Sequence, residues 1–222
     1  MSIGKLSAAA VVALAVGFTG SAVVAETIKV GRNDPGVIAT FDFSDMDREI
    51  DISATIRFAL DEVLNDIWKF TVTVANTSTN IGDVKNRISS FGFDVRPIDG
   101  ITLSDDDNER WSGVDVGPVG GAGYQFFDLN ACVRSGNVCT GSGGGVVGQE
   151  TSVLGLDIES ASEHLFFGDF ATRWQEVGTK GKDSIVIGGT VAPIPLPPVG
   201  FMLLGALGAL AFAARRRQVE KV

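Results

Sequence analysis

The sequence predicts an all-β protein, an antiparallel and sandwich-like body built from many short strands. Several runs alternate apolar with polar or small residues, the period-two pattern of strands that are buried on one face. Stretches rich in Gly, Asn, Asp and Ser separate these runs, and the strand–helix alternation of a parallel α/β sheet is absent from the sequence. Residues 26–190 are long enough for one domain with a sizeable core.

Four strands are expected in the first half of this body. They cover residues 37–43, 52–60, 68–74 and 88–95. In the third run, Lys69, Thr71 and Thr73 alternate with large apolar residues, which places the two kinds of side chain on opposite faces of a strand. Residues 61–66 are expected to form a hairpin connection, although their apolar spacing also allows one helical turn.

The second half of the body is less regular. Residues 99–150 are expected to be rich in loops because Gly, Asp, Asn and Ser dominate them. Strands are expected again over residues 152–158, 164–174 and 184–188. The proline-rich stretch 191–198 is expected to be a stiff linker.

Residues 1–25 have the layout of a secretory signal peptide. Lys5 gives a positive start, residues 6–18 are apolar, and Val23-Val24-Ala25 supplies small residues for signal peptidase, with a second possible cut after Ala22. The alternative is a first membrane helix, and the polar break at residues 19–21 argues against it.

The C-terminal part of the chain has the layout of a single transmembrane helix. Residues 199–214 carry no charge and would span about 24 Å as a helix. A bilayer core is about 30 Å thick, and flanking arginines can reach toward the headgroups. Arg215, Arg216 and Arg217 mark residues 215–222 as a cytoplasmic tail. A membrane is therefore expected to hold this segment of the chain.

A proline-rich stretch precedes this helix, and its residues are Pro193, Ile194, Pro195, Leu196, Pro197 and Pro198. The three-part layout resembles the VPLPA-type variant of the PEP-CTERM sorting signal, with Ile194 where that pattern has Val and Pro198 where it has Ala. The resemblance implies an exported protein of a Gram-negative bacterium that an exosortase processes. It also implies association with exopolysaccharide at the cell surface or in a biofilm matrix.

Two further observations concern this resemblance. The pairing of Asn76-Thr77-Ser78 with the run Phe91-Gly92-Phe93-Asp94 is similar to exported bodies that precede PEP-CTERM signals. The competing interpretation of the tail is an LPXTG signal of Gram-positive sortases, but Val199 stands where that enzyme needs a threonine.

The charge of the body excludes one class of partner. Residues 26–192 hold 13 of the 18 basic and 26 of the 27 acidic side chains, a net charge of −13. Such a surface repels nucleic acid and anionic lipid.

Cys132 and Cys139 are the only cysteines in the sequence. Export would place them in an oxidising compartment, where such a pair normally forms a disulfide. A redox-active pair usually has two intervening residues, and a metal site would need more ligands. A local cysteine pair here also resembles the cistern subgroup of PEP-CTERM proteins.

Residues 105–109 are the densest group of oxygen ligands in the sequence. Asp105, Asp106, Asp107 and Glu109 lie in five consecutive positions, and calcium prefers six to eight oxygen ligands. The run lacks the EF-hand spacing, so a solvated acidic loop is the alternative to a calcium site.

Catalysis is not expected. His164 is the only histidine, and a Gly-x-Ser-x-Gly elbow is absent from the sequence. Residues 143–148 match GxGxxG, but a nucleotide fold needs a strand before that motif and a helix after it. Trp68, Trp111 and Trp174 are candidates for a sugar-stacking platform or for the core. The sequence therefore predicts a structural surface or matrix protein, with an envelope carbohydrate- or calcium-binding module and an envelope hydrolase as the alternatives.

Overall fold

The computed structural model describes residues 27–79, 84–106, 109–121, 123–141, 143–178, 181 and 183–195. The predicted signal peptide (1–25), transmembrane segment (199–214) and basic tail (215–222) lie outside these ranges. Within them, the chain forms no helix with the length and apolar character that a membrane crossing requires.

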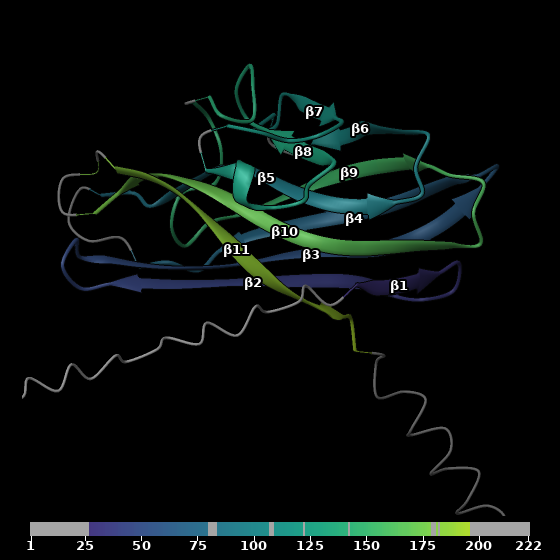
Figure 1. Ribbon diagram of the computed structural model, residues 1–222, viewed down its shortest axis with the longest axis horizontal. Coiled ribbons are helices and arrows are strands. Elements are labelled where there is room, and N and C mark those ends of the chain that lie inside the picture. Colours follow the sequence, from purple (N-terminus) through teal and green to yellow (C-terminus); the bar gives the residue numbers. More distant parts are fainter. Residues whose placement is uncertain are drawn as a thin grey trace, which may run out of the picture.

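The described chain folds into antiparallel strands and one short 3-10 helix (Figure 1). The elements in chain order are β1 (Ile28–Gly31), β2 (Gly36–Asp45), β3 (Ile50–Leu64), β4 (Ile67–Asn76), β5 (Arg87–Arg96), β6 (Gly100–Asp106), β7 (Gly113–Val116), η1 (Tyr124–Phe126), β8 (Ala131–Arg134), β9 (Thr151–Glu159), β10 (His164–Val177) and β11 (Asp183–Pro193).

Strand β11 joins two layers of one continuous sheet and crosses the molecule diagonally (Figure 1). Its first part, up to Gly189, pairs with β10, whereas residues 190–193 pair with β2. The β10 layer continues through β5 and β8 to β7, and the β2 layer continues through β3, β4 and β9 to β6. Because β6 and β7 also lie close together, the sheet is nearly closed, like a barrel. The predicted all-β antiparallel class is confirmed; the two layers are parts of one sheet that folds over itself.

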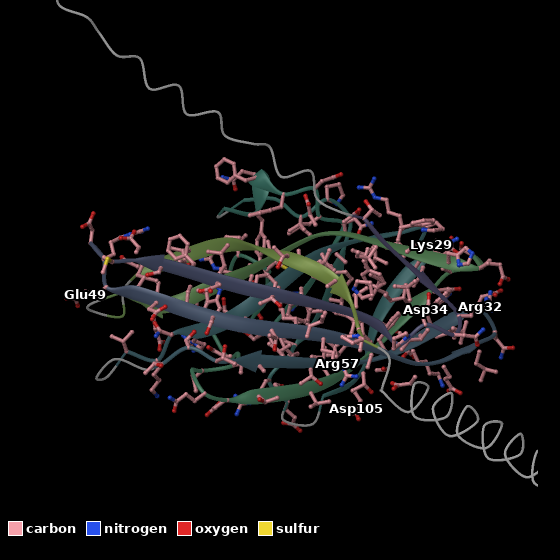
Figure 2. The ribbon with its side chains drawn as sticks, turned by 90° about the horizontal axis from the view of Figure 1, so that it is seen from below. Lys29, Arg32, Asp34, Glu49, Arg57 and Asp105 are labelled. Atoms are coloured by element: carbon pink, nitrogen blue, oxygen red, sulfur yellow. A yellow bond between two sulfur atoms is a disulfide. The ribbon has the colours of Figure 1, made fainter. Side chains whose placement is uncertain are left out.

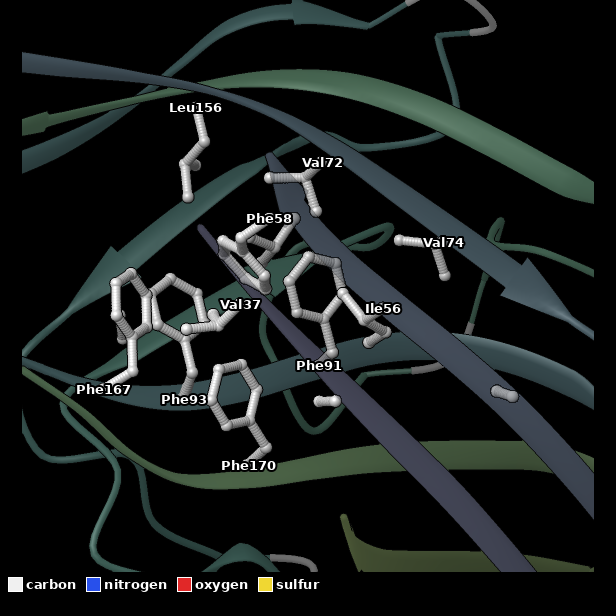
Figure 3. Close-up of a cluster of buried hydrophobic side chains, with 14 of the residues drawn as sticks. Val37, Ile56, Phe58, Val72, Val74, Phe91, Phe93, Leu156, Phe167 and Phe170 are labelled. Atoms are coloured by element: carbon white, nitrogen blue, oxygen red, sulfur yellow. The ribbon is translucent and has the colours of Figure 1, made fainter. Parts of the chain in front are cut away.

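Phe58 lies at the centre of the core between the two layers (Figure 3). Its ring on β3 lies 5.0 Å from that of Phe93 and 5.6 Å from that of Phe170, measured between centroids. The Phe58 ring also contacts the rings of Phe167, Phe91 and Phe70, at centroid distances of 5.7, 6.1 and 6.3 Å. Aromatic pairs at such separations contribute about 0.5–1.5 kcal/mol beyond their buried area. The cluster therefore holds the two layers together.

The predicted loop-rich character of residues 99–150 is wrong in part, because β6, β7 and β8 lie there. The alternation of Ile101 and Leu103 with Thr102 and Ser104 was a local signal for β6. β7 and β8 have only four residues each, too few for periodicity to show, and are specified by pairing with each other and with β5.

The linker predicted from residue 191 is also too long. β11 continues to Pro193, which lies opposite Val37, and the next amide, of Ile194, donates to the carbonyl of Gly36 at 3.1 Å. Ile194 is buried. The pairing of β11 with β10 ends at Gly189, so residues 190–193 pair with β2 along one side as an edge strand, where proline is tolerated. The body therefore extends past residue 190.

The hairpin expected over residues 61–66 is confirmed, but it is tighter than expected. β3 continues to Leu64, so Asn65 and Asp66 alone form the turn, both with positive φ of 52° and 64°. Two residues with positive φ suit the right-handed twist of a two-residue hairpin, and Asn and Asp tolerate that conformation. The alternative of a helical turn is wrong.

The side chain of Asn76, at the end of β4, connects three segments of the chain by hydrogen bonds. Its buried side-chain amide donates to the carbonyls of Asn86 at 2.5 Å and Val146 at 2.9 Å, and its Oδ1 accepts from the amide of Ser78. Ser78 in turn bonds through its hydroxyl to the backbone of Ser53 on β3. The run Asn76-Thr77-Ser78 thus supplies hydrogen bonds that hold this part of the fold together.

Candidate functional site

A small second cluster packs on the outer face of the β5–β8 layer. It consists of Tyr124, Leu129, Cys132, Cys139 and Ala171. The hydroxyl of Ser90 on β5 lies 2.9 Å from the Tyr124 hydroxyl and donates to the carbonyl of Cys139 at 2.6 Å. Burial raises the pKa of Tyr124 above its usual range, against a smaller lowering by the Ser90 hydrogen bond. This residue therefore stays a neutral packing group.

The run Phe91-Gly92-Phe93-Asp94 divides between the two clusters. Phe91 and Phe93 point into the main core, whereas Gly92 faces the second cluster, where a Cβ would come within 2.7 Å of the Leu129 side chain. Asp94 forms an ion pair with Arg96 at 2.8 Å. Burial raises the pKa of the Asp94 carboxyl, and the Arg96 hydrogen bond opposes that rise. Core packing and an ion pair therefore account for the residue types in this run.

The predicted disulfide is confirmed. Cys132 on β8 is bonded to Cys139, with an S–S distance of 2.07 Å. A cavity of about 280 Å³ lies beside it, with the half-exposed side chains of Val116 and Val138 in its wall. The bond ties the excursion after β8 to the second cluster.

Removing this disulfide is expected to cost about 2–3 kcal/mol of unfolding free energy, because it closes a short loop in the unfolded chain. Urea unfolding of the Cys132→Ser/Cys139→Ser double variant against the unaltered chain measures the loss. The unaltered chain under a thiol reductant should match the double variant. Mapping under non-reducing conditions that finds two free thiols would contradict the prediction.

A second cavity, of about 310 Å³, opens on the outer face of β3, β4, β9 and β6. We call it the outer groove. The side chains along it are Asp61, Lys69, Thr71, Ser104, Asp105, Val153 and Asp157, with Gly155 among them. Figure 2 shows that Asp105 lies nearer to the Arg32 end of the long strands than to the Glu49 end. The β3–β4 hairpin and the later strands β6 and β9 therefore build one polar depression.

Two β-bulges shape the outer groove. The register of β3 against β4 shifts between Leu60 and Glu62, which leaves Asp61 as the extra residue. The register of β6 against β9 shifts between Leu103 and Asp105, which leaves Ser104 as the extra residue. Bulges re-aim side chains and bend a strand locally. Asp61 and Ser104 thus enter the groove from opposite sides.

Gly155 lets β6 approach β9 closely at the edge of the groove. It lies opposite Thr71 on β4 and Asp105 on β6. A Cβ at this position would come within 2.6 Å of the Ser104 hydroxyl and 3.2 Å of the Asp105 Cβ. A side chain at residue 155 would therefore clash with Ser104 and Asp105 and displace these β6 residues.

Two hydrogen bonds orient charged side chains at the outer groove. Thr71 donates its hydroxyl to Asp61 at 2.7 Å, and Lys69 donates to Glu62 at 2.7 Å. The Glu62 hydrogen bond raises the pKa of Lys69, with a smaller contribution from the charge of Asp157, which lies opposite Lys69 in the sheet. Lys69 is thus paired with Glu62, while Asp61, Asp105 and Asp157 give the lining of the groove a negative net charge.

The acidic run at residues 105–109 starts in a strand and not in a loop. Asp105 and Asp106 belong to β6, opposite Gly155 and Leu154 of β9. Glu109 is exposed with φ at 52°, and Asp107 lies outside the described residues. Among the described residues, His, Cys, Asp and Glu form no group of three or more that could hold a metal ion. The predicted calcium site at Asp105, Asp106, Asp107 and Glu109 stays a prediction.

Of the proposed sorting residues, the structure describes Pro193 at the end of β11 and Pro195 after it. The remaining ones lie outside the described ranges, namely Leu196, Pro197, Pro198, Arg215, Arg216 and Arg217.

The suggested sugar-stacking platform is wrong. Trp68, Trp111 and Trp174 are all buried, so none offers a face to a ligand. Trp111 lies in the connection between β6 and β7, where it packs edge-on against Phe91 on β5 and donates to the Ser152 hydroxyl on β9 at 3.1 Å.

The glycines of residues 143–148 also have a packing role. Gly145 has φ at 93°, and a Cβ there would come within 2.0 Å of the carbonyl of Ile88. The amide of Ile88 and the carbonyl of Val146 form a bridge at this point. The stretch is pressed against β5, an arrangement that differs from a nucleotide-binding loop.

No family model, curated protein or solved structure matches this chain. The side chains of the outer groove are therefore the basis on which a ligand for it can be proposed. Sequence reasoning singled out Asp105 alone among its residues, because the others are dispersed over four strands without a local motif.

Proposed function

We propose that this chain is an exported protein of the cell surface or extracellular matrix of a Gram-negative bacterium. In this proposal, signal peptidase removes residues 1–25 and an exosortase processes the tail after an inner-membrane intermediate. The mature body then associates with exopolysaccharide and has a structural role without catalysis.

The observation that carries this proposal is the layout of the chain. Residues 1–25, which have the layout of a secretory signal, precede the body, and a proline motif, an apolar segment and an arginine cluster follow it. The Cys132–Cys139 disulfide supports export, because such bonds persist in oxidising compartments and are rare in reducing ones.

The outer groove supports contact with a carbohydrate. Carboxylates and hydroxyls of Asp61, Thr71, Ser104 and Asp157 line a cavity of about 310 Å³. Such groups accept and donate the hydrogen bonds that sugar hydroxyls need. We therefore include carbohydrate binding in the proposed role. We also propose calcium as a ligand of residues 105–109.

Processing at both ends is the expected result for the exported protein. Intact-mass analysis should give a mature chain that begins near Glu26 and ends near residues 195–198. Cells without the exosortase should retain the tail and serve as the control. A secreted or surface form that keeps Arg215, Arg216 and Arg217 in the presence of the enzyme would contradict the sorting proposal.

A further inference from the structure

One stretch of the chain with few charges carries both an exposed phenylalanine and an open pocket. It covers residues 112–148, and we call it the β7–β8 lobe; Figure 1 shows β7 and β8 on the side of the molecule opposite to β2. We propose that two copies of this chain associate through the lobe, with Phe126 of each copy in the pocket beside the other copy's disulfide. This inference goes beyond the proposed function and does not depend on it.

Phe126 is exposed because the aromatic residues around it are anchored inward. Tyr124, two residues before it, is buried beside the Ser90 hydroxyl. The ring of Phe127 packs over β11, where a Cβ on Gly188 would come within 2.7 Å of it. Phe126 itself is 81% exposed. It therefore presents most of an apolar ring to solvent on a backbone that its neighbours hold in place.

The pocket that we assign to this ring is the cavity of about 280 Å³ beside Cys139. Val116, Pro118 and Val138 are exposed apolar residues of its wall, the two valines at 51% and 53%. A cavity of about 150 Å³ holds a benzene ring in a protein core, so this pocket has room for a phenyl ring. Exposed apolar side chains that gather around one depression mark an interaction site, whereas single ones need no explanation.

Charge favours contact between two copies at this lobe. It contains only three charged side chains, Asp115, Asp128 and Arg134. Arg134 pairs with Asp115 at 2.9 Å, and Asp128 pairs with Arg96 at 2.9 Å. The body as a whole has a net charge of −13, so two copies repel each other over most of their surface and least at the lobe.

One two-fold axis can fill both pockets at once, because ring and pocket belong to the same lobe. A Cβ on Gly121, shortly before η1, would lie 3.7 Å from the side chain of Thr140 in the pocket wall. A two-fold contact repeats each interaction in reverse, so each copy gives one ring and receives one. Two buried phenylalanines supply only part of the about 1,200 Å² that stable complexes bury. The dimer should therefore be weak, and dissociated at the dilution of a fluorescence measurement.

Photo-crosslinking between two isotopic forms of the full-length chain tests the proposal. The chain is purified in mild detergent, with micelles in excess over protein, and p-benzoylphenylalanine replaces Phe126 in the light form. After irradiation with the heavy, unaltered form, residue 126 should be linked to residues 115–120 or 138–140 of the heavy copy. The same probe in place of Met46, which is 91% exposed outside the lobe, should give no link to these residues. Links from residue 126 to other segments only, or within one copy only, would overturn the proposal.

Sedimentation velocity over a range of concentrations measures the strength of the contact. Phe126→Ala and Val138→Asp should each raise the dimer dissociation constant by at least about tenfold. Met46→Ala is the matched control and should dimerise as the unaltered chain does. Added salt should strengthen the dimer, because it screens the repulsion between two acidic bodies. Thermal unfolding checks that each variant is folded.

Several results would contradict the assignment. A chain that stays monomeric at every concentration has no such surface, and a dimer that persists in Phe126→Ala uses another one. Growth beyond the dimer would rule out the two-fold arrangement. If the unaltered chain is monomeric and Phe126→Ala instead releases bound detergent, an amphiphile and not a second copy occupies the lobe.

Discussion

Replacing Phe58 with Ala is expected to lower the free energy of unfolding by about 3–5 kcal/mol. Phe58 is fully buried and its ring contacts the aromatic rings of both layers, from Phe70 on β4 to Phe93 and Phe170 opposite. Its removal loses the transfer free energy of the side chain and leaves a cavity that neighbouring rings can fill only in part. Urea unfolding followed by tryptophan fluorescence measures the change.

Phe126→Ala is the matched control, because this phenylalanine is 81% exposed on η1. Its unfolding free energy should stay within about 0.5 kcal/mol of that of the unaltered chain. A loss below about 1 kcal/mol for Phe58→Ala would show that the two layers do not depend on this cluster.

Replacing Asn76 with Ala is expected to cost about 2–3 kcal/mol of unfolding free energy. The carbonyl of Asn86 and the amide of Ser78 would lose the partners that the buried Asn76 side chain provides. Buried polar groups without partners cost more than the lost hydrogen bond itself, because they cannot return to water. Hydrogen exchange should also show faster opening of the segment around residues 84–88, which Asn76 fastens to β4.

Thr77→Ala is the control for this position. The exposed hydroxyl of Thr77 bonds only to the Ser53 hydroxyl among the contacts seen here, so its loss should cost less than about 1 kcal/mol. Equal losses for Asn76→Ala and Thr77→Ala would mean that the Asn76 bonds add little to stability.

Local alternation was sufficient to predict the long strands. The pattern around Trp68, Lys69 and Phe70 predicted β4 and its buried face, because a side-chain period of two is a property of each strand by itself. The Cys132–Cys139 bond was also predictable, since the sequence offered a single possible pair. The same reasoning missed β7 and β8, because they have four residues each and depend on their partner strands.

The route of β11 and the outer groove were decided by the tertiary structure. β11 leaves β10 after Gly189 and pairs with β2, a change of partner that no local pattern marks. The groove depends on a bulge at Asp61, a bulge at Ser104 and an absent side chain at Gly155, on three different strands. Sequence patterns specify which face of a strand a residue occupies, whereas neighbours across a sheet are specified by register, and register depends on the packing of the whole core.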